Sequence, residues 1–411
     1  MRVARSRFIV GLIILVFFVI SFLTNIIGPL VPDVIRSFNL SLTLAGLLPF
    51  SFFIAYGIMS IPSGILVERW GERWVMILAF VLSAIGAMLF ALIPQFQMYI
   101  CSLFLIGAGM AMLQVAINPL LRVAGGEEHF AFNSVLAQLF FGLASFLSPF
   151  VFSWLVTTDG DATSGIVGMI SSLAPDEMRW LSLYWVFTIV SLLMVFVIVA
   201  SKFPIVVRKA DEKAGALSVH LSLLRNPIVR WYFLGVFMYV GTEQGVANWI
   251  SQFLQTYHGV DPQTTGAATV AMFWGLMTAG TALGLVLLKF VDSKKVITGF
   301  TVGAMVSLAG ALFGTKEMAM IAFPVVGFFA SVMWSIIISL ALNSVSVHHG
   351  SLSGILVTGI AGGAIIPLII GGIGDAIGLR GGMIFLFFTL AYILSIGFWA
   401  KPLINNKLVG Q

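Results

Sequence analysis

Long apolar runs are the feature of this sequence that most limits its fold. A helix rises 1.5 Å per residue and needs about 20 apolar residues to cross a bilayer, and twelve runs reach that length. They cover residues 8–32, 42–67, 74–93, 97–121, 131–157, 181–201, 229–256, 266–290, 296–314, 318–345, 351–377 and 381–400. Charged residues make up only 9% of the 411 residues, against about 25% in a soluble domain. The sequence therefore predicts an all-α membrane protein with twelve transmembrane helices.

The basic residues predict the orientation of these helices. If the N-terminus is cytoplasmic, all but four of the 21 Lys and Arg residues fall in cytoplasmic loops and tails. The four exceptions are Arg36, Arg179, Lys316 and Arg380. We therefore expect a multi-pass protein of the inner (plasma) membrane with both termini in the cytoplasm. The positive net charge then reflects membrane orientation, and no nucleic-acid partner is expected.

The longest predicted cytoplasmic loop divides the chain into two halves. Residues 1–201 and 229–411 each hold six apolar runs, and residues 202–228 form a charged cytoplasmic linker between them. The halves resemble each other weakly, because Asn25 aligns with Glu243 and Pro149 with Pro367 at one common offset. Such internal similarity is typical of transporters built from repeats. We expect two pseudo-symmetric bundles of six helices.

A charged motif lies in the loop after the second apolar run. It comprises Gly64, Glu68, Arg69, Gly71 and Arg73 in the pattern G-x-x-x-[D/E]-[R/K]-x-G-x-[R/K]. A glycine at position 64 would allow close helix approach, and one at position 71 a tight turn. The motif resembles the signature of the major facilitator superfamily, which implies that fold and a cytoplasmic gate at these residues.

The seventh run carries the candidate site that most constrains function. Glu243 falls near the middle of this run, where a carboxylate costs about 2–3 kcal/mol or more unless it is paired, hydrated or protonated. Gln244, Asn248 and Gln252 recur at every fourth position beside it. We interpret the stretch as a substrate site or a site for a coupling cation, facing a water-filled cavity. A buried acid satisfied by a neighbouring helix is the structural alternative.

Further polar and aromatic residues at membrane depth suit a polyhydroxylated ligand. Amides both donate and accept hydrogen bonds, and flat aromatic faces pack against sugar rings. An every-fourth stripe also runs from Ser331 to Asn343 in the tenth run. The predicted substrate-binding residues are Asn25, Gln114, Asn118, Gln138, Glu243, Gln244, Asn248, Trp249, Trp274, Trp334 and Asn343. Helix–helix contacts are the alternative role for any one of them.

Several stretches resemble the fucose–galactose–glucose:proton symporter family, which includes L-fucose permease-like sugar transporters. They are Ala45-Gly46 with 61–66, 116–119, 136–138, 239–245 and the run from Gly350 through Gly362-Gly363 to Pro367. The resemblance implies import of a hexose or a related sugar. The acids that the family uses in helices 1 and 4 fall on Gly28 and Gln114. Both titratable groups would therefore be missing from those two positions, and Glu243 is the alternative coupling group.

These observations predict a secondary active transporter that imports a hexose or a related sugar by alternating access. The coupling ion is a proton or sodium, and a facilitator remains open; no other cofactor and no metal are expected. The alternative is a drug or lipid exporter of the same superfamily, which would need a less polar cavity. A sugar receptor would need a signalling domain, and an enzyme a nucleophile–base pair or a metal site, neither of which the sequence offers. The expected partners are the sugar and the lipid bilayer, and a monomer is expected.

Overall fold

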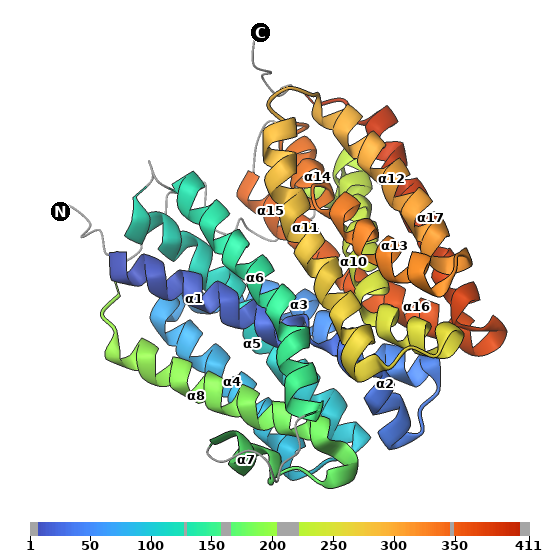
Figure 1. Ribbon diagram of the computed structural model, residues 1–411. Helices are drawn as coiled ribbons and strands as arrows, with labels where there is room; N and C mark the ends of the chain where they lie inside the picture. The colour runs from blue at the N-terminus through green and yellow to red at the C-terminus, as the bar shows by residue number, and fades with distance from the viewer. Residues whose placement is uncertain (1–6, 127–129, 158–165, 204–221, 346–348, 403–411) are drawn as a thin grey trace. The chain divides into compact units, whose positions relative to one another are not determined.

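The computed structural model describes residues 7–126, 130–157, 166–203, 222–345 and 349–402, which form helices joined by short turns and loops. Figure 1 shows these helices in chain order. The first six predicted spans correspond to α1 (Arg7–Thr24) with α2 (Ile27–Phe38), α3 (Leu42–Trp70), α4 (Glu72–Leu92), α5 (Phe96–Gly125), α6 (Phe130–Thr157) and α8 (Ser182–Ala200). Two short elements, α7 (Ile166–Ser171) and η3 (Asp176–Leu181), precede α8.

The last six predicted spans follow the same pattern. They correspond to α10 (Pro227–His258), η5 (Pro262–Gly266) with α11 (Ala267–Leu287), α12 (Ser293–Phe313), α13 (Lys316–Ala330) with α14 (Met333–Leu342), α15 (His349–Thr358) with η6 (Gly359–Ala361) and α16 (Gly362–Ile377), and α17 (Leu379–Trp399). The all-α fold class is therefore confirmed for the described part of the chain.

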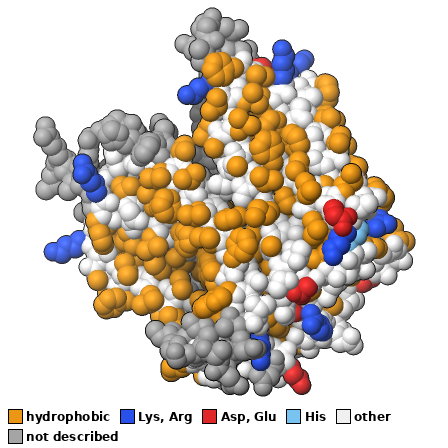
Figure 2. Space-filling model, in the orientation of Figure 1, with side chains coloured by type: hydrophobic (Ala, Val, Ile, Leu, Met, Phe, Trp, Pro, Cys, Tyr) orange, Lys and Arg blue, Asp and Glu red, His pale blue; other side chains and the backbone are white. Residues whose placement is uncertain are grey.

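Eleven helical segments of the described residues are long and apolar enough to cross a membrane. The remaining predicted span, the seventh, corresponds to α10, which has 32 residues but is not among these eleven. The polar residues that mark its candidate site also lower its hydropathy. Large apolar side chains such as Phe196 and Ile321 lie on the surface, and Figure 2 shows broad hydrophobic areas with few charged side chains between them. A lipid bilayer covers such areas.

The helices form two compact units, and each unit includes a short segment from the other half of the sequence. The first unit comprises residues 1–40, 51–207 and 261–271, and the second comprises 41–50, 208–260 and 272–411. Most of the predicted linker, 204–221, lies outside the described residues. The predicted boundaries at residues 201 and 229 therefore stay a prediction.

Close helix contacts hold the first unit together. Helix α1 packs against α6, and α4 packs against both α5 and α8. A Cβ atom at Gly107 of α5 would overlap the carbonyl oxygen of Phe52, so this glycine permits α5 to approach α3. Where α4, α5 and α8 meet, the rings of Phe90 and Tyr99 stack, and the ring of Tyr184 meets both of them edge-to-face.

The second unit is built around α10. This helix packs against α16 and α17, and α12 packs against α13 and α17. A Cβ atom at Gly362 would overlap the backbone of Phe237, and one at Gly241 would overlap the side chain of Ile366. Two glycines therefore let α10 and α16 approach closely, and this contact fixes the orientation of the α10 side chains.

Three of the spans are interrupted. The first breaks at Asn25–Ile26, the tenth at Ser331–Val332, and the eleventh contains the 3-10 turn η6. The predicted stripe from Ser331 to Asn343 does not lie on one continuous helix, because Ser331 is the C-cap of α13, Ser335 and Ser339 lie in α14, and Asn343 is the C-cap of α14. Interrupted helices are common around the binding sites of transporters.

Candidate functional site

Helix α10 carries the candidate site of the second unit. The helix begins after Asn226, whose side-chain oxygen accepts a hydrogen bond from the backbone N–H of Ile228 at 3.0 Å. It ends at Gly259, which adopts the left-handed conformation with φ +61°. At 1.5 Å per residue Glu243 lies about 24 Å from the start of the helix, halfway along it. The acid therefore lies midway along this helix.

Two donors hold the carboxylate of Glu243. The hydroxyl of Tyr239, one turn earlier, donates to Oε2 at 2.6 Å, and the side-chain amide of Gln244 donates to Oε1 at 3.1 Å. Hydrogen bonds to a charged acceptor are stronger than those between neutral groups, so this pair fixes the carboxylate in place. Each oxygen keeps a second lone-pair direction, with which it can accept a hydrogen bond from a ligand hydroxyl or bind a cation.

The hydrogen-bonded chain continues along the same helix. The side-chain amide of Asn248 donates to the backbone oxygen of Gln244 at 2.8 Å and to its side-chain oxygen at 3.2 Å. The side chains of Gln244 and Asn248 are buried, whereas Glu243 is partly exposed. The predicted residues Glu243, Gln244 and Asn248 therefore form one polar network, to which Tyr239 is added.

Of the three predicted tryptophans, Trp334 lies beside this network. Its ring on α14 is 6.2 Å from that of Tyr239, and its side chain is partly exposed. Trp249 is only 1% exposed and donates its Nε1–H to the backbone oxygen of Pro367 at 3.2 Å, which joins α10 to α16. Trp274 is buried edge-to-face against Phe273 on α11. The geometry thus gives Trp249 a packing contact and leaves Trp334 as the aromatic surface near Glu243.

Asn343 lies farther along the helix of Trp334. It forms the C-cap of α14 and is nine positions beyond Trp334, about 13 Å along the helix axis. Its side chain is partly exposed. No hydrogen bond among the described residues joins it to the Glu243 network.

In the first unit, Asn25 is buried in a cluster that joins α1 to α6. Its amide donates to Ser145 at 2.8 Å and to Ser21 at 3.3 Å, and the two serine hydroxyls lie 2.6 Å apart. Ser21 also lies 2.6 Å from the backbone oxygen of Phe141. This geometry corresponds to the alternative role foreseen for such residues, a polar helix–helix contact.

The other predicted residues of the first unit are more accessible. Asn118 on α5 and Gln138 on α6 are exposed, and Gln114 is partly exposed. The amide of Asn118 donates to the backbone oxygen of Gln114 at 3.2 Å, which places both residues on one side of α5. These three amides keep donors and acceptors available to a ligand.

The charged motif connects α3, α4 and α8. Gly71 has φ +80° and permits the turn between α3 and α4, as predicted. Arg73 donates to the backbone oxygen of Val199 at 2.5 Å, near the end of α8. Glu68 and Arg69 are exposed. The expectation for Gly64 is wrong in this structure, because a Cβ atom there would meet nothing within 4 Å.

Sequence reasoning missed two residues with buried polar contacts. Tyr239 is part of the seventh-run stretch, and its spacing of four residues from Glu243 was a usable signal. Asp33 follows the first apolar run and is not among the predicted site residues, yet its side chain is buried in the first unit. Only the three-residue spacing between Asp33 and Arg36 hinted at its environment. Among the described residues, no group of three His, Cys, Asp or Glu side chains could hold a metal ion.

Comparison with known proteins identifies the family. Residues 13–315 match the model of the Major Facilitator Superfamily. This chain belongs to that superfamily. It is 31% identical over 392 residues to the glucose/galactose transporter of Brucella abortus biovar 1 (strain 9-941), covering 93% of this chain and 92% of that protein. It is 27% identical over 384 residues to the L-fucose-proton symporter of Escherichia coli (strain K12), covering 88% and 86% respectively.

Solved structures agree with this superfamily fold. The crystal structure of the E. coli fucose:proton symporter FucP (N162A) matches with a TM-score of 0.67 and 24% identity, over 95% of this chain and 98% of that chain. The bacterial homologue of the human lysosomal transporter Spinster matches with a TM-score of 0.78 and 16% identity, over 95% and 98%. At these identities the likeness shows the fold alone. The chain is therefore a multi-pass membrane protein with the major facilitator fold.

Proposed function

We propose that this protein is a secondary active transporter that imports a hexose or a related sugar by alternating access, driven by a cation gradient. The observation that carries the proposal is the carboxylate of Glu243, fixed halfway along α10 by Tyr239 and Gln244. A carboxylate at this depth is costly, so its presence indicates a function. The names of the relatives above, a glucose/galactose transporter and an L-fucose-proton symporter, support a sugar as the substrate.

The polar network on α10 suits both parts of this function. A sugar presents neighbouring hydroxyls that donate and accept, and the carboxylate and amides of this helix offer both kinds of partner. Trp334 adds an aromatic face near Tyr239, against which the apolar side of a sugar ring can pack. A proton or a sodium ion on Glu243 would neutralise the charge during transport, which links the ion to the sugar.

The proposal also includes the membrane in which the protein lies and its orientation there. The distribution of Lys and Arg supports cytoplasmic termini in an inner membrane, with the end of α2 and the start of α3 on the external side. In this proposal the protein acts as a monomer, has no enzymatic activity and binds no nucleic acid.

Uptake into proteoliposomes tests the proposal. Labelled glucose, galactose and L-fucose would be offered with an inward proton gradient, an inward sodium gradient, or no gradient. We expect at least one sugar to accumulate above equilibrium under one gradient, and Glu243→Gln to abolish accumulation while exchange of sugar without a gradient continues. The matched control is Glu317→Gln, the same change at an exposed acid in the first turn of α13.

The outcomes separate the alternatives. Equilibration without accumulation would mean a facilitator, and normal accumulation by the Glu243→Gln variant would remove Glu243 from coupling. Failure to take up any sugar, with competition by lipophilic cations for binding, would favour the exporter instead.

A further inference from the structure

Two short segments of the chain pack with helices from the opposite half of the sequence. Residues 41–50, at the start of the second span, belong to the second unit, and residues 261–271, at the start of the eighth span, belong to the first. The two segments thus occupy corresponding places in the two halves. In the orientation proposed above, both lie on the external side of the membrane. Each of them is bound by a carboxyl group from the other half.

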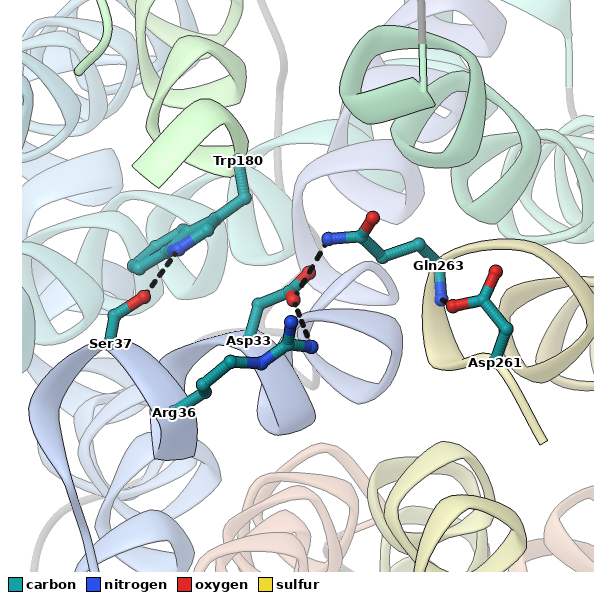
Figure 3. Close-up of polar contacts among 6 residues, drawn as sticks. All are labelled: Asp33, Arg36, Ser37, Trp180, Asp261 and Gln263. Carbon is teal, nitrogen blue, oxygen red and sulfur yellow. Dashed lines mark hydrogen bonds and ion pairs between the residues drawn. The ribbon is translucent and has the colours of Figure 1, made fainter. Parts of the chain in front are cut away.

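In the first unit, Asp33 of α2 binds the start of the eighth span. Its Oδ1 atom accepts hydrogen bonds from the side-chain amide of Gln263 on η5 at 3.0 Å and from Arg36 at 3.1 Å. Figure 3 shows these two side chains converging on the carboxyl group from η5 and α2. The short helix η5 also packs against α2 and α6. Helices of the N-terminal half therefore hold the first turn of the eighth span.

In the second unit, Asp375 of α16 binds the start of the second span. Its carboxylate accepts three hydrogen bonds, at 2.5, 2.8 and 2.9 Å, from the first turn of α3 at Leu42 and Thr43. A Cβ atom at Gly371 would overlap the backbone oxygen of Leu42, and one at Gly46 would crowd the backbone of α16. Two glycines therefore bring α3 and α16 into close backbone contact beside these hydrogen bonds.

The two acids differ in how completely they are paired. Asp375 is exposed, and both of its oxygens have donors. Asp33 is only 3% exposed, and its Oδ2 atom is excluded from solvent without a hydrogen-bond partner among the described residues. A buried polar atom without a partner costs free energy, which is recovered when water reaches it. The Asp375 contact therefore favours the closed arrangement, and the incomplete pairing of Asp33 limits how stable that arrangement is.

We propose that these two contacts form an external gate of the transport cycle. A sugar that enters from outside must reach Glu243, halfway along α10, and in alternating access it does so only while the external ends of the two halves are apart. The contacts of Asp33 with Gln263 and of Asp375 with the start of α3 join those ends. Both contacts therefore break when the external side opens and form again when it closes. The inference rests on the proposed function and names the residues that close one side of its site.

A disulfide across the second contact tests whether that contact must break. A Cβ atom at Gly372 would lie 3.9 Å from the hydroxyl oxygen of Thr43, in ordinary van der Waals contact. Thr43→Cys and Gly372→Cys can therefore approach the geometry of a disulfide. Cys101→Ser removes the single natural cysteine. We expect oxidation to lower sugar uptake into proteoliposomes by about ten-fold or more, because a locked gate stops alternating access, and reduction to restore it.

The controls for the disulfide are the two single-cysteine variants, whose uptake should not change on oxidation. Titration of free thiols shows whether the bond has formed. Normal uptake by the cross-linked protein would overturn the gate and leave sugar transport in place. Failure of the bond to form would contradict the contact between α3 and α16 on which the gate depends.

Access from outside tests the first contact without depending on transport. Trp334→Cys, again with Cys101→Ser, places a thiol at the proposed sugar site, where the ring of Trp334 lies 6.2 Å from that of Tyr239. A membrane-impermeant maleimide is added outside sealed right-side-out vesicles. Gln263→Met removes a donor that Asp33 has only while the gate is closed. We expect this change to make labelling about two- to ten-fold faster, the population shift that the loss of one hydrogen bond produces.

The matched control is Gln97→Met, the same change at an exposed position near the start of α5, which should leave the labelling rate unchanged. A membrane-permeant maleimide shows that the thiol is reactive in every variant. An unchanged rate for Gln263→Met, or an equal increase for Gln97→Met, would overturn the role of the Asp33 contact. Faster labelling of Gln263→Met in a protein that takes up no sugar would support the gate and overturn the sugar as substrate.

Discussion

The carboxylate of Asp375, near the end of α16, accepts hydrogen bonds from Thr43 through both its backbone N–H at 2.9 Å and its side-chain hydroxyl at 2.5 Å. The backbone N–H of Leu42 donates to the other carboxylate oxygen at 2.8 Å. The first amides of a helix have no partner within the helix. Asp375 therefore caps α3 from a helix more than 300 residues away in sequence, within the second unit.

Loss of this cap should destabilise the protein. Asp375→Ala removes three hydrogen bonds from the first turn of α3, and the loss of an N-cap costs about 1 kcal/mol. We expect the midpoint of thermal unfolding in detergent to fall by about 2–4 °C. Thr43→Ser keeps the hydroxyl and should unfold near the wild-type temperature, whereas Thr43→Val should show part of the loss. Identical melting of Asp375→Ala and the wild-type protein would contradict the prediction.

The hydroxyl of Tyr239 should matter for transport. Tyr239→Phe keeps the ring beside Trp334 but removes the donor to Glu243, and a hydrogen bond to a charged group contributes about 1.5–3 kcal/mol. We expect kcat/KM for sugar uptake to fall by about ten-fold or more.

The control for this change lies on the same helix. Tyr232 has its hydroxyl 3.1 Å from that of Ser344, and no hydrogen bond among the described residues joins it to the Glu243 network. Tyr232→Phe should therefore leave uptake close to normal. Equal effects of the two substitutions would show that Tyr239 acts through general packing and not through Glu243.

The close contact between α10 and α16 should tolerate no added methyl group. Alanine at Gly362 would overlap the backbone oxygen of Phe237, which cannot move aside as a flexible side chain could. We expect Gly362→Ala to destabilise the protein by about 1–3 kcal/mol. The matched control is Gly354→Ala on α15, where a Cβ atom would meet nothing within 4 Å. Thermal unfolding of both variants checks this, and a Gly362→Ala protein as stable as the wild type would contradict the close approach of the two helices.

The helices and the position of Glu243 halfway along α10 could be predicted because they depend on local sequence. Apolar length fixes where a span begins and ends, and a single acid within such a span is conspicuous. The contact of Tyr239 with Glu243 could also have been predicted, because residues four apart share one face of a helix.

Contacts between residues far apart in the sequence could not be predicted. Asn25 bonds Ser145 across 120 positions, and Asp33 bonds Gln263 across 230. Nothing in the local pattern specifies which helices pack together, so a polar residue that joins two helices looks the same as one that faces a ligand. The interruption at Ser331 was missed because neither proline nor glycine marks it; apolar periodicity continues through the break.

The last prediction distinguishes these two roles, a contact between helices and a contact with the ligand, for two polar residues of the first unit. Asn25 makes two buried hydrogen bonds to serines of α1 and α6, whereas Gln138 is exposed on α6. Asn25→Ala should therefore destabilise the protein by about 1–3 kcal/mol, because net hydrogen bonds contribute about 0.5–1.5 kcal/mol each. Its KM for sugar should change little in the fraction that remains folded.

Gln138→Ala should give the opposite result. Its side chain is exposed, so the unfolding temperature should stay near that of the wild-type protein. If its amide binds a sugar hydroxyl, KM should rise by about five- to ten-fold, which corresponds to the loss of one hydrogen bond. Thermal unfolding and initial uptake rates, measured on the same two preparations, decide the matter. A raised KM for Asn25→Ala with unchanged melting would make Asn25 a ligand contact, and a normal KM for Gln138→Ala would remove Gln138 from the sugar site.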